Sequence, residues 1–479
     1  MLLWFSFICR KAKCLSAFCF IAGLLHASEP ISNRLITYPA PAGVPLNGDF
    51  TVKVRNPGRP WRSLSTYLVK VDSAGARGHT IENASLASFD FDGTVEVSVT
   101  SNSKPIRWAR IRPLSYGIKP RVEGNTVIFS LSRPRNLSVE VNGDIFHNLH
   151  LFANSVEVNR VKPTDPNVIY FGPGVYDFPN HKLRVPSGKT VYLAGGAVLR
   201  GEISIDNAND VQVMGRGMTD QRPISITNSK NVKISGIFAS QFFTGGSQHV
   251  TLSHVKCISY QGWGDGADVI CSSDVLMDSL FNRNSDDCVA IYAKRGQFSG
   301  GTRGITVQNS TLWADVAHPI LVGTHGNTKQ PEAIENLRFA NLDILDQMEP
   351  QLDYQGCMSL NASDSNLIRN VRFENIRVED FRLGQLVNIR VFFNRKYCTS
   401  PGRGIENVYF KDISYNGHHA NPSIIEGYDD ARKVKNIVFE NLSINGTHIF
   451  DQMSKLRWYK TSDMANFFVG EHVDGVRFR

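Results

Sequence analysis

The chain has 479 residues and a formal net charge of +8 at neutral pH, from 52 basic and 44 acidic residues. The basic excess is small and spread along the chain, without a dense Lys/Arg block or an aromatic–basic module, so nucleic-acid binding is not expected. The length suits two or three average domains or one long repetitive domain. No nucleotide-binding loop, zinc-type spacing or Ser-His-Asp order is present, so we expect no cofactor and no metal.

The first residues have the features of a secretory signal. A basic cluster (Arg10, Lys11 and Lys13) precedes an apolar run at 15–25, and the small residue Ala27 follows. This order predicts a cleaved signal peptide over residues 1–27 and a secreted or periplasmic protein. No later segment has 18 consecutive apolar residues, so no membrane span is expected. We also expect a monomer.

Five of the eight cysteines lie beyond residue 27. Their odd number and their spacing allow one or two disulfides in an exported protein. Small buried apolar side chains are an equally good interpretation.

Residues 35–162 alternate between apolar and polar side chains in short runs, as half-buried strands do. The clearest runs are 50–55, 95–99, 127–131 and 137–141, with turn sequences such as Asn56-Pro-Gly and Asp92-Gly between them. Many short strands at this spacing predict an N-terminal β-sandwich domain.

A repeated phrase occupies the remainder of the chain. Asn-Val-Arg-Phe-Glu-Asn-Ile at 370–376 has close relatives at 336–342, 407–413 and 436–442, and looser ones at 231–234, 249–252, 274–277 and 304–307. Each phrase is too short to bury its apolar face alone, so neighbouring copies must stack. The recurring Asn and Asp suit turns, where they tolerate left-handed geometry and bond their own backbone. The prediction is an all-β protein in which a right-handed parallel β-helix at 165–475 follows the sandwich.

Acidic residues concentrate in one part of this repeat. Asp265 lies in a Gly-Asp-Gly-Ala-Asp stretch, and the adjacent pair Asp286 and Asp287 follows about one coil later. Stacking should bring the three carboxylates together, and the backbone must turn at the pair because neighbours in a regular strand point to opposite faces. Mutual repulsion should keep at least one protonated near neutral pH, as the general acid of glycosidic cleavage requires.

Each motif taken alone is more often a structural turn. The one-coil spacing and the presence of His318 one or two coils further on favour a catalytic site. Asp268 is interpreted as a structural turn residue that bonds the loop.

The motifs also resemble a known family. Asp-Asp-Cys-Val-Ala-Ile at 286–291 closely resembles the Asp-Asp-Cys-x-Ala-Ile motif of glycoside hydrolase family 28, the polygalacturonase family. The Gly-Asp-Gly-Ala-Asp stretch resembles its Asn-Thr-Asp-Gly-x-Asp motif. His318 resembles its Gly-His-Gly histidine, with Ala317 and Pro319 replacing the glycines. The resemblance implies that Asp286 is the general acid, that Asp265 and Asp287 hold and activate water with inversion, and that His318 supports the acid.

One departure bears on the substrate. That family has an Arg-Ile-Lys motif that binds a uronate carboxylate, whereas the matching stretch here, 356–362, contains no cation. The N-terminal sandwich resembles that of the dextranase and isopullulanase family 49, which has the same helix and three aspartates. We therefore expect secreted polysaccharide hydrolysis with a neutral α-glucan favoured over galacturonan, and a polygalacturonase-type pectin hydrolase as the alternative.

Four residues are candidates for substrate binding. Trp263 and Trp313 offer flat apolar faces to sugar rings, and Tyr292 and Lys294 follow the aspartate pair. Two further functions stay open. The aspartates could bind calcium in a β-helix polysaccharide lyase, with Lys294 or Arg295 as the base, or the chain could be a non-catalytic glycan-binding helix.

Overall fold

The computed structural model describes residues 33–74, 78–158 and 161–479. The predicted signal peptide, residues 1–27, lies outside the described residues. Within them, no helix combines the length and apolar character that crossing a bilayer demands. All five described cysteines are free and most are buried, so the apolar interpretation holds for them.

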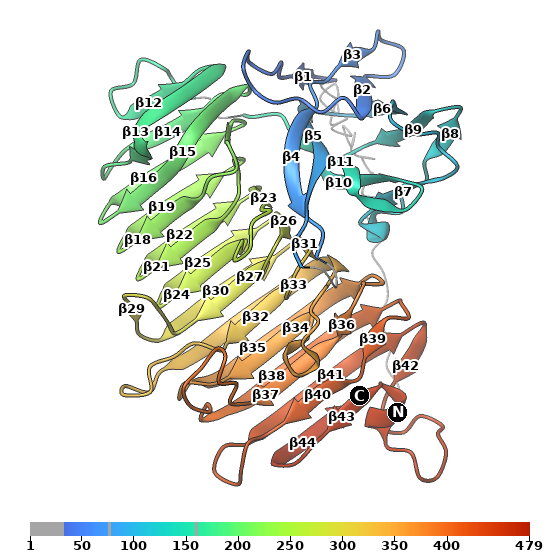
Figure 1. The fold of residues 1–479 in the computed structure, drawn as a ribbon, viewed down its shortest axis with the longest axis vertical. Coiled ribbons are helices and arrows are strands. Elements are labelled where there is room, and N and C mark those ends of the chain that lie inside the picture. The colour runs from blue at the N-terminus through green and yellow to red at the C-terminus, as the bar shows by residue number, and fades with distance from the viewer. Residues whose placement is uncertain (1–32, 75–77, 159–160) are drawn as a thin grey trace, which may run out of the picture. The chain divides into compact units, whose positions relative to one another are not determined.

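The N-terminal part is a sandwich of two sheets around one apolar core (Figure 1). In the first sheet β5 pairs in parallel with β11, and antiparallel strands flank them. Its strands are β1 (Leu35–Thr37), β5 (Ile81–Phe91), β11 (Asp144–Ser155), β10 (Arg135–Val141), β7 (Ala109–Arg112) and β4 (Tyr67–Asp72). The second sheet contains β3 (Arg62–Ser63), β2 (Phe50–Arg55), β6 (Val95–Ser101), β9 (Thr126–Leu131) and β8 (Arg121–Glu123).

From Val168 onward the chain winds into a parallel β-helix, whose stacked coils run from green to red in Figure 1. Three ladders of parallel strands form its walls. The first contains β12 (Val168–Phe171), β14 (Thr190–Leu193), β16 (Asn209–Gly215), β19 (Lys230–Ser235), β22 (Gln248–Ser253), β25 (Ser273–Asp278), β30 (Thr302–Gln308), β33 (Ala333–Asp346), β35 (Leu367–Val378), β38 (Gly404–Tyr415), β41 (Val434–Ile444) and β44 (Val473–Phe478).

The second ladder begins with two long strands, continues through five short ones and ends in the C-terminal parts of the long strands β33 to β41. It contains β13 (Gly174–Arg184), β15 (Ala197–Asp206), β17 (Met218–Thr219), β20 (Phe238–Ala239), β23 (Lys256–Ile258), β26 (Phe281–Asn284) and β31 (Thr311–Ala314). The third ladder contains β18 (Ile224–Thr227), β21 (Phe242–Gly245), β24 (Ala267–Ile270), β27 (Val289–Tyr292), β32 (Ile320–Gly323), β34 (Met358–Ala362), β37 (Val387–Val391), β40 (Ser423–Glu426) and β43 (Phe467–Val469).

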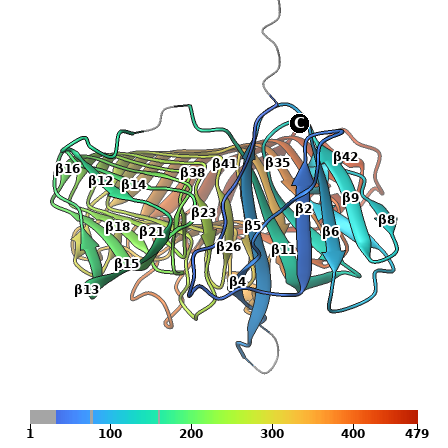
Figure 2. The same ribbon diagram turned by 90° about the horizontal axis from the view of Figure 1, so that it is seen from above.

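Short elements decorate the loops: the strands β28 (Lys294–Arg295), β29 (Phe298–Ser299), β36 (Gly384–Gln385), β39 (Ala420–Asn421) and β42 (Thr447–Ile449), the 3-10 turns η1 (Leu114–Tyr116) and η2 (Leu352–Tyr354), and α1 (Thr461–Met464). Figure 2 shows the coils lying behind one another when the molecule is turned by 90°. The predicted fold class, a parallel β-helix preceded by a β-sandwich, is confirmed.

The repeated phrase explains how the coils stack. Phe373, Phe410 and Phe439, its central aromatics, stack inside the helix with ring centroids 4.8 and 4.5 Å apart. Asn370 and Asn407, its first asparagines, have φ of 57° and 59°, the left-handed conformation that asparagine tolerates. Their side chains donate to the asparagine one coil earlier, as in the 3.2 Å bond from Asn407 to Asn370. The conformation was predicted, but the bonding connects neighbouring coils rather than a residue and its own backbone.

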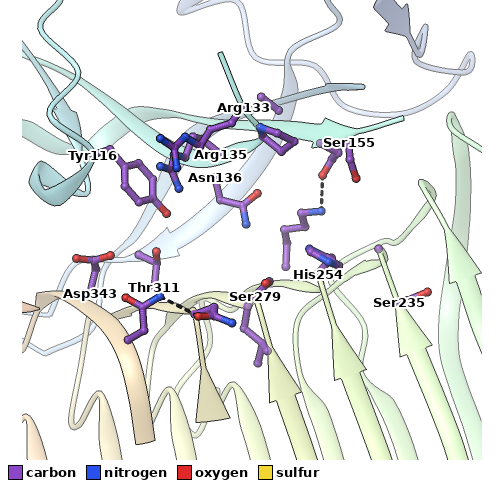
Figure 3. A pocket seen from close by; sticks show the side chains of 18 of the residues that line it. Tyr116, Arg133, Arg135, Asn136, Ser155, Ser235, His254, Ser279, Thr311 and Asp343 are labelled. Carbon is purple, nitrogen blue, oxygen red and sulfur yellow. Dashed lines mark hydrogen bonds between the residues drawn. The ribbon is translucent and has the colours of Figure 1, made fainter. Parts of the chain in front are cut away.

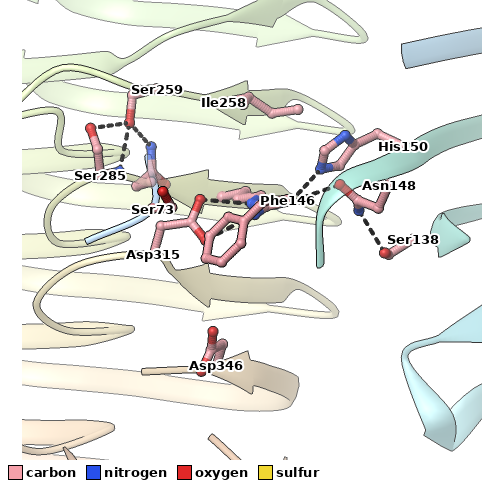
Figure 4. A network of polar contacts seen from close by, with 12 residues as sticks. Ser73, Ser138, Phe146, Asn148, His150, Ile258, Ser259, Ser285, Asp315 and Asp346 are labelled. Atoms are coloured by element: carbon pink, nitrogen blue, oxygen red, sulfur yellow. Dashed lines mark hydrogen bonds and ion pairs between the residues drawn. The ribbon is translucent and has the colours of Figure 1, made fainter. Parts of the chain in front are cut away.

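The sandwich packs on the second ladder. Val69 and Phe152 of the sandwich share an apolar cluster with Phe238, Ile258 and Phe281 of the helix. Beside this cluster lies a buried polar network (Figure 4). Residues 33–479 therefore form one compact unit, and separate domains at 35–162 and 165–475 stay a prediction.

Arg283 of β26 is the centre of that network. Its guanidinium donates to Asp315 at 2.7 and 3.0 Å and to Asn148 of the sandwich at 2.9 Å (Figure 4). Arg283 and Asp315 are both fully buried, and the ring of Trp313 lies 4.0 Å below the guanidinium carbon. The second ladder is thus tied to the sandwich by a hydrogen bond from this buried, ion-paired guanidinium as well as by apolar contact.

Candidate functional site

The predicted catalytic residues, three aspartates and His318, lie at the turns that lead into three successive strands of the third ladder. Ala267 of β24 pairs with Val289 of β27, an offset of 22 residues, and Ala290 pairs with Leu321 of β32, an offset of 31. The same offsets place Asp265, Asp287 and His318 in one column across neighbouring coils. The predicted one-coil spacing of the aspartates follows from this register.

A glycine allows two of these coils to approach closely. A Cβ on Gly266 would lie 2.4 Å from the carbonyl oxygen of Cys288, closer than real atoms approach. The backbone also bends around Asp286, between β26 and β27, as predicted for two adjacent acids that serve one site.

Asp265, Asp286 and Asp287 converge on one point. Each offers a carboxylate oxygen that lies within 4.8 Å of the oxygens offered by the other two. Asp286 Oδ1 also accepts a 3.0 Å hydrogen bond from the backbone amide of Asp287. Oxygens this close could also share a hard cation such as Ca²⁺, so the calcium alternative is a hypothesis that experiment must test.

Asp287 is held by three donors. The Tyr292 hydroxyl donates to Oδ2 at 3.1 Å, and the backbone amide and ring Nδ1 of His318 donate to Oδ1 at 3.2 and 2.7 Å. These three contacts fix the position of the Asp287 side chain.

His318 carries a positive charge in this arrangement. Its Nε2 faces the carbonyl oxygen of Tyr354, which can only accept, while Nδ1 faces the Asp287 carboxylate. Burial by itself lowers the pKa of His318, but the attraction of Asp287 outweighs burial and raises the pKa to about 9. The ring contacts Asp287 rather than Asp286, so any support of the acid by His318 acts through charge and not through a direct bond.

The other carboxyl groups have raised pKa values. Burial and the neighbouring Asp287 charge raise the pKa of Asp286 to about 7 and that of Asp268 to about 8. Burial, followed by repulsion from Asp268 and Asp286, raises the pKa of Asp265 well above its ordinary value. Near neutral pH the site therefore holds a carboxylic acid with a proton to donate, which is what the leaving oxygen of glycosidic cleavage needs.

The carboxylates open into a cleft of about 590 Å³. Its walls come from several coils and from the β4–β5 hairpin of the sandwich. The lining residues are His79, Gln241, Phe243, Gly262, Trp263, Asp265, Asp268, Ile270, Asp286, Asp287, Tyr292, Arg295, Val316, Ala317, His325, Glu349, Pro350, Gln351, Tyr354, Lys396 and Tyr397.

Two of the four predicted substrate-binding residues line this cleft. Trp263 is 77% exposed, so its indole face is free to stack on a sugar ring. Tyr292 is nearly buried, and its hydroxyl holds Asp287, which gives it a positioning role.

The other two predicted residues, Trp313 and Lys294, are not among the residues that line the cleft. Trp313 is fully buried beneath Arg283, because β31 belongs to the ladder that the sandwich covers. Lys294 and Arg295 form β28 of a small hairpin, where neighbouring side chains point to opposite sides, and Arg295 is the one that lines the cleft.

Several cleft residues were missed by sequence reasoning. Asp268 was assigned to a turn, but its carboxylate accepts a 3.0 Å bond from Gln241 and lines the cleft. Glu349, Tyr354 and Lys396 arrive from long loops. For Asp268 a sequence signal existed, because it lies three residues from Asp265 in the same motif and could have been expected at the same site.

Comparison with known proteins identifies the family. The model for glycosyl hydrolases family 28 matches residues 182–463, more than half of the chain. The chain belongs to this family. The resemblance predicted from the aspartate motifs is thus confirmed, and so is the enzyme class, a glycoside hydrolase.

Curated relatives of this family 28 chain match it over part of its length. A probable endopolygalacturonase D of Emericella nidulans is 26% identical over 153 residues, which are 31% of this chain and 26% of that protein. A probable endo-xylogalacturonan hydrolase A of Aspergillus fumigatus is 24% identical over 265 residues, which are 48% of this chain and 61% of that protein. The matches thus span between about a quarter and three fifths of these relatives.

Solved structures share the fold. Dex49A from Penicillium minioluteum superposes with a TM-score of 0.60 at 13% identity, covering 93% of this chain and 96% of that one. The family 28 exopolygalacturonase of Yersinia enterocolitica superposes with a TM-score of 0.50 at 12% identity, covering 80% and 96%. Identities this low establish the fold alone.

Ala317, which replaces the first glycine of the family's Gly-His-Gly motif, adopts a backbone conformation that glycine favours. Ala317 has φ of 64°, in the left-handed region where glycine is free of strain. A glycine fits this position without cost, whereas the alanine here is held there by its surroundings, including a backbone bond from its amide to the carbonyl of Met348.

Proposed function

We propose that this family 28 protein is a secreted, inverting hydrolase that cleaves the O-glycosidic bonds of a polysaccharide. The observation that carries the proposal is the contrast between two adjacent carboxyl groups. Burial and the charge of Asp287 raise the pKa of Asp286 to about 7, whereas the carboxyl group of Asp287 accepts hydrogen bonds from His318 and Tyr292.

The roles follow from this contrast. Asp286 donates its proton to the glycosidic oxygen as the bond to the anomeric carbon breaks. A water molecule between Asp265 and Asp287 attacks that carbon, and Asp287 takes the proton that the water loses. His318 stabilises the charge of Asp287 before the proton arrives. Attack from the face opposite the leaving oxygen gives inversion.

Two substrate classes are candidates. A neutral α-glucan is supported by the 356–362 stretch, which lacks a cation and is buried around β34. Galacturonan is supported by Arg295 and Lys396, two cations in the cleft that could hold a uronate carboxylate, and by the activities named for the curated relatives.

The first experiment incubates the purified protein with α-glucans and pectic galacturonans, following reducing ends and the ultraviolet absorbance of unsaturated ends together. New reducing ends without absorbance support hydrolysis, and the responsive polymer selects the substrate class. Absorbance that rises with the reducing ends, and that a calcium chelator abolishes, would establish the lyase alternative. The anomer formed first, read by proton NMR, tests inversion.

A matched pair of variants tests the acid. Asp286→Asn should abolish turnover while glycan binding persists. Asp274→Asn changes an exposed aspartate outside the cleft and should behave as the wild type. Equal turnover in the two variants would refute the role of Asp286, and a protein that binds glycan without any turnover would be a binding helix.

The secretion proposal has its own test. Expression of the full chain, followed by N-terminal sequencing of the exported protein, should show removal of residues 1–27. Export with an intact N-terminus would contradict it.

A further inference from the structure

A second cavity lies between the sandwich and the helix, and it is larger than the catalytic cleft. Its volume is about 950 Å³, against about 590 Å³ for the cleft, and the two share no lining residue. In Figure 3 Tyr116, Arg133, Arg135 and Ser155 of the sandwich face Ser235, His254 and Ser279 of the helix turns across it. It is a groove with one wall from each part of the molecule.

Hydrogen bonds and ion pairs between the sandwich and the β-helix fix the two walls relative to each other. Arg216 of the helix donates to Asp90 at 2.9 Å and to the carbonyl of Ser155 at 2.7 Å, both in the sandwich. Farther along the interface, Arg112 of the sandwich donates to Glu379 of the helix at 2.6 Å. The groove is therefore a built feature of the interface.

The groove carries an excess of positive charge. Of its cations, Arg216 is paired with Asp90, and Arg377 with Asp343 at 2.6 Å. Arg133 is exposed and has no ion pair within the described residues, and Arg135 lies 4.1 Å over the ring of Tyr116 without a carboxylate partner there. These two guanidiniums are available to an anion.

Lys256 adds a buried ammonium to the floor. It is 4% exposed, and among the described residues its three donors meet one acceptor, Asn154 Oδ1 at 2.6 Å. Burial and the charge of Arg216 lower its pKa to about 7. An ammonium taken out of water with unused donors is costly unless an anion or acceptor joins it, so this side chain favours an anionic occupant.

The remaining lining suits a saccharide. Hydroxyl and amide groups line the groove: Asn136, Ser155, Ser235, Ser279, Asn309 and Thr311. Such groups pair with sugar hydroxyls, and guanidiniums pair with carboxylates in a two-pronged geometry. A single phosphate would leave most of this volume of about 950 Å³ empty.

We propose that this groove is a second, non-catalytic binding site for an acidic oligosaccharide, with Arg133 and Arg135 holding its carboxylates. The site would keep the protein on an acidic polymer while the cleft cleaves either that polymer or one associated with it. The inference goes beyond the proposed hydrolysis and is tested by binding, so failure of one leaves the other intact.

The test uses the full-length Asp286→Asn protein and isothermal titration with a short oligogalacturonide. A double variant, Arg133→Ala/Arg135→Ala, is added to it, and Arg59→Ala/Arg107→Ala serves as the control because it removes two exposed arginines of the sandwich outside the groove. A neutral isomalto-oligosaccharide and inorganic phosphate are titrated in parallel.

We expect oligogalacturonide binding that the groove variant weakens at least tenfold at one site, about 1.4 kcal/mol, and that the control leaves unchanged. Equal affinity in the groove variant and the control would overturn the proposal. So would binding of the neutral oligosaccharide that the groove variant weakens to the same extent, or binding of phosphate without binding of oligogalacturonide. Binding should also weaken with added salt, because exposed guanidiniums are screened.

Discussion

Replacing His318 with glutamine should move the alkaline limb of the pH–activity profile. In the wild type burial and Asp287 raise the pKa of Asp286 to about 7, and the His318 charge opposes that rise. Since Asp286 must be protonated to act as the acid, activity should be highest below pH 7 and fall about tenfold per pH unit above it.

Replacing the charged His318 with neutral glutamine removes the positive charge that lowers the pKa of Asp286. A full charge at this range shifts a carboxyl pKa by roughly one unit or more, so the midpoint of the limb should move from about pH 7 to about pH 8 or higher. Activity on the acid side should fall as well, because Asp287 loses the 2.7 Å bond that fixes it. The variant would thus be slower overall and yet keep its activity to a higher pH.

The assay is kcat/KM from initial rates of reducing-end release between pH 5 and 9, since this ratio reports the pKa values of the free enzyme. His448→Gln, which changes an exposed histidine of β42, is the control and should keep the wild-type profile. A limb that stays near pH 7 in His318→Gln, or moves to lower pH, would refute the assignment of Asp286 as the acid under the influence of His318.

Three further predictions concern the fold and the cleft. Arg283→Met removes the near cation of the buried Asp315 and leaves it only the 3.8 Å contact with Arg382, so it should cost about 3–5 kcal/mol in urea unfolding. Most of this loss should be recovered in Arg283→Met/Asp315→Leu, and a loss below about 1 kcal/mol in the single variant would contradict a stabilising ion pair. Trp263→Ala should raise KM severalfold with little change in kcat, by loss of a stacking contact of about 1 kcal/mol, and an unchanged KM would exclude Trp263 from substrate binding. Asn407→Ala should lower the free energy of unfolding by about 1–2 kcal/mol because alanine resists φ of 59°. Asn407→Gly tolerates this φ and should lower the free energy of unfolding less; an equal loss in both variants would show that the lost hydrogen bonds matter more than the backbone conformation.

Much of the architecture was predictable because it repeats. The phrase at 370–376 and its copies contain the stacked phenylalanine and the left-handed asparagine of each coil, so the period alone predicts a helix of stacked strands. The same logic extends to the acids. Asp265 and Asp287 meet because parallel pairing repeats at a coil's length, and that length can be counted in the sequence.

The positions of side chains that the sequence does not determine depend on contacts between distant segments. Whether Trp313 faces a substrate or a protein interior is decided by the sandwich, more than 150 residues earlier in the chain, which covers β31 through Arg283. Lys294 and Arg295 are alike in sequence, and the register of a four-residue hairpin decides which one enters the cleft. Lys396 reaches the site from a loop whose path no local pattern determines.

The column of Asp265, Asp287 and His318 has a consequence for how the protein can change over evolution. The offsets along it are 22 and 31 residues, yet ladder pairing keeps neighbouring coils at one strand spacing, about 4.8 Å. Eight of the nine extra residues of the second interval lie in the loop that carries the outlying hairpin of β28 and β29, and the ninth lies in the turn before β32. Insertions and deletions in such hairpins can remodel the walls of the cleft while the distances among the reacting groups stay constant, so specificity can diversify by loop exchange without disturbing the chemistry.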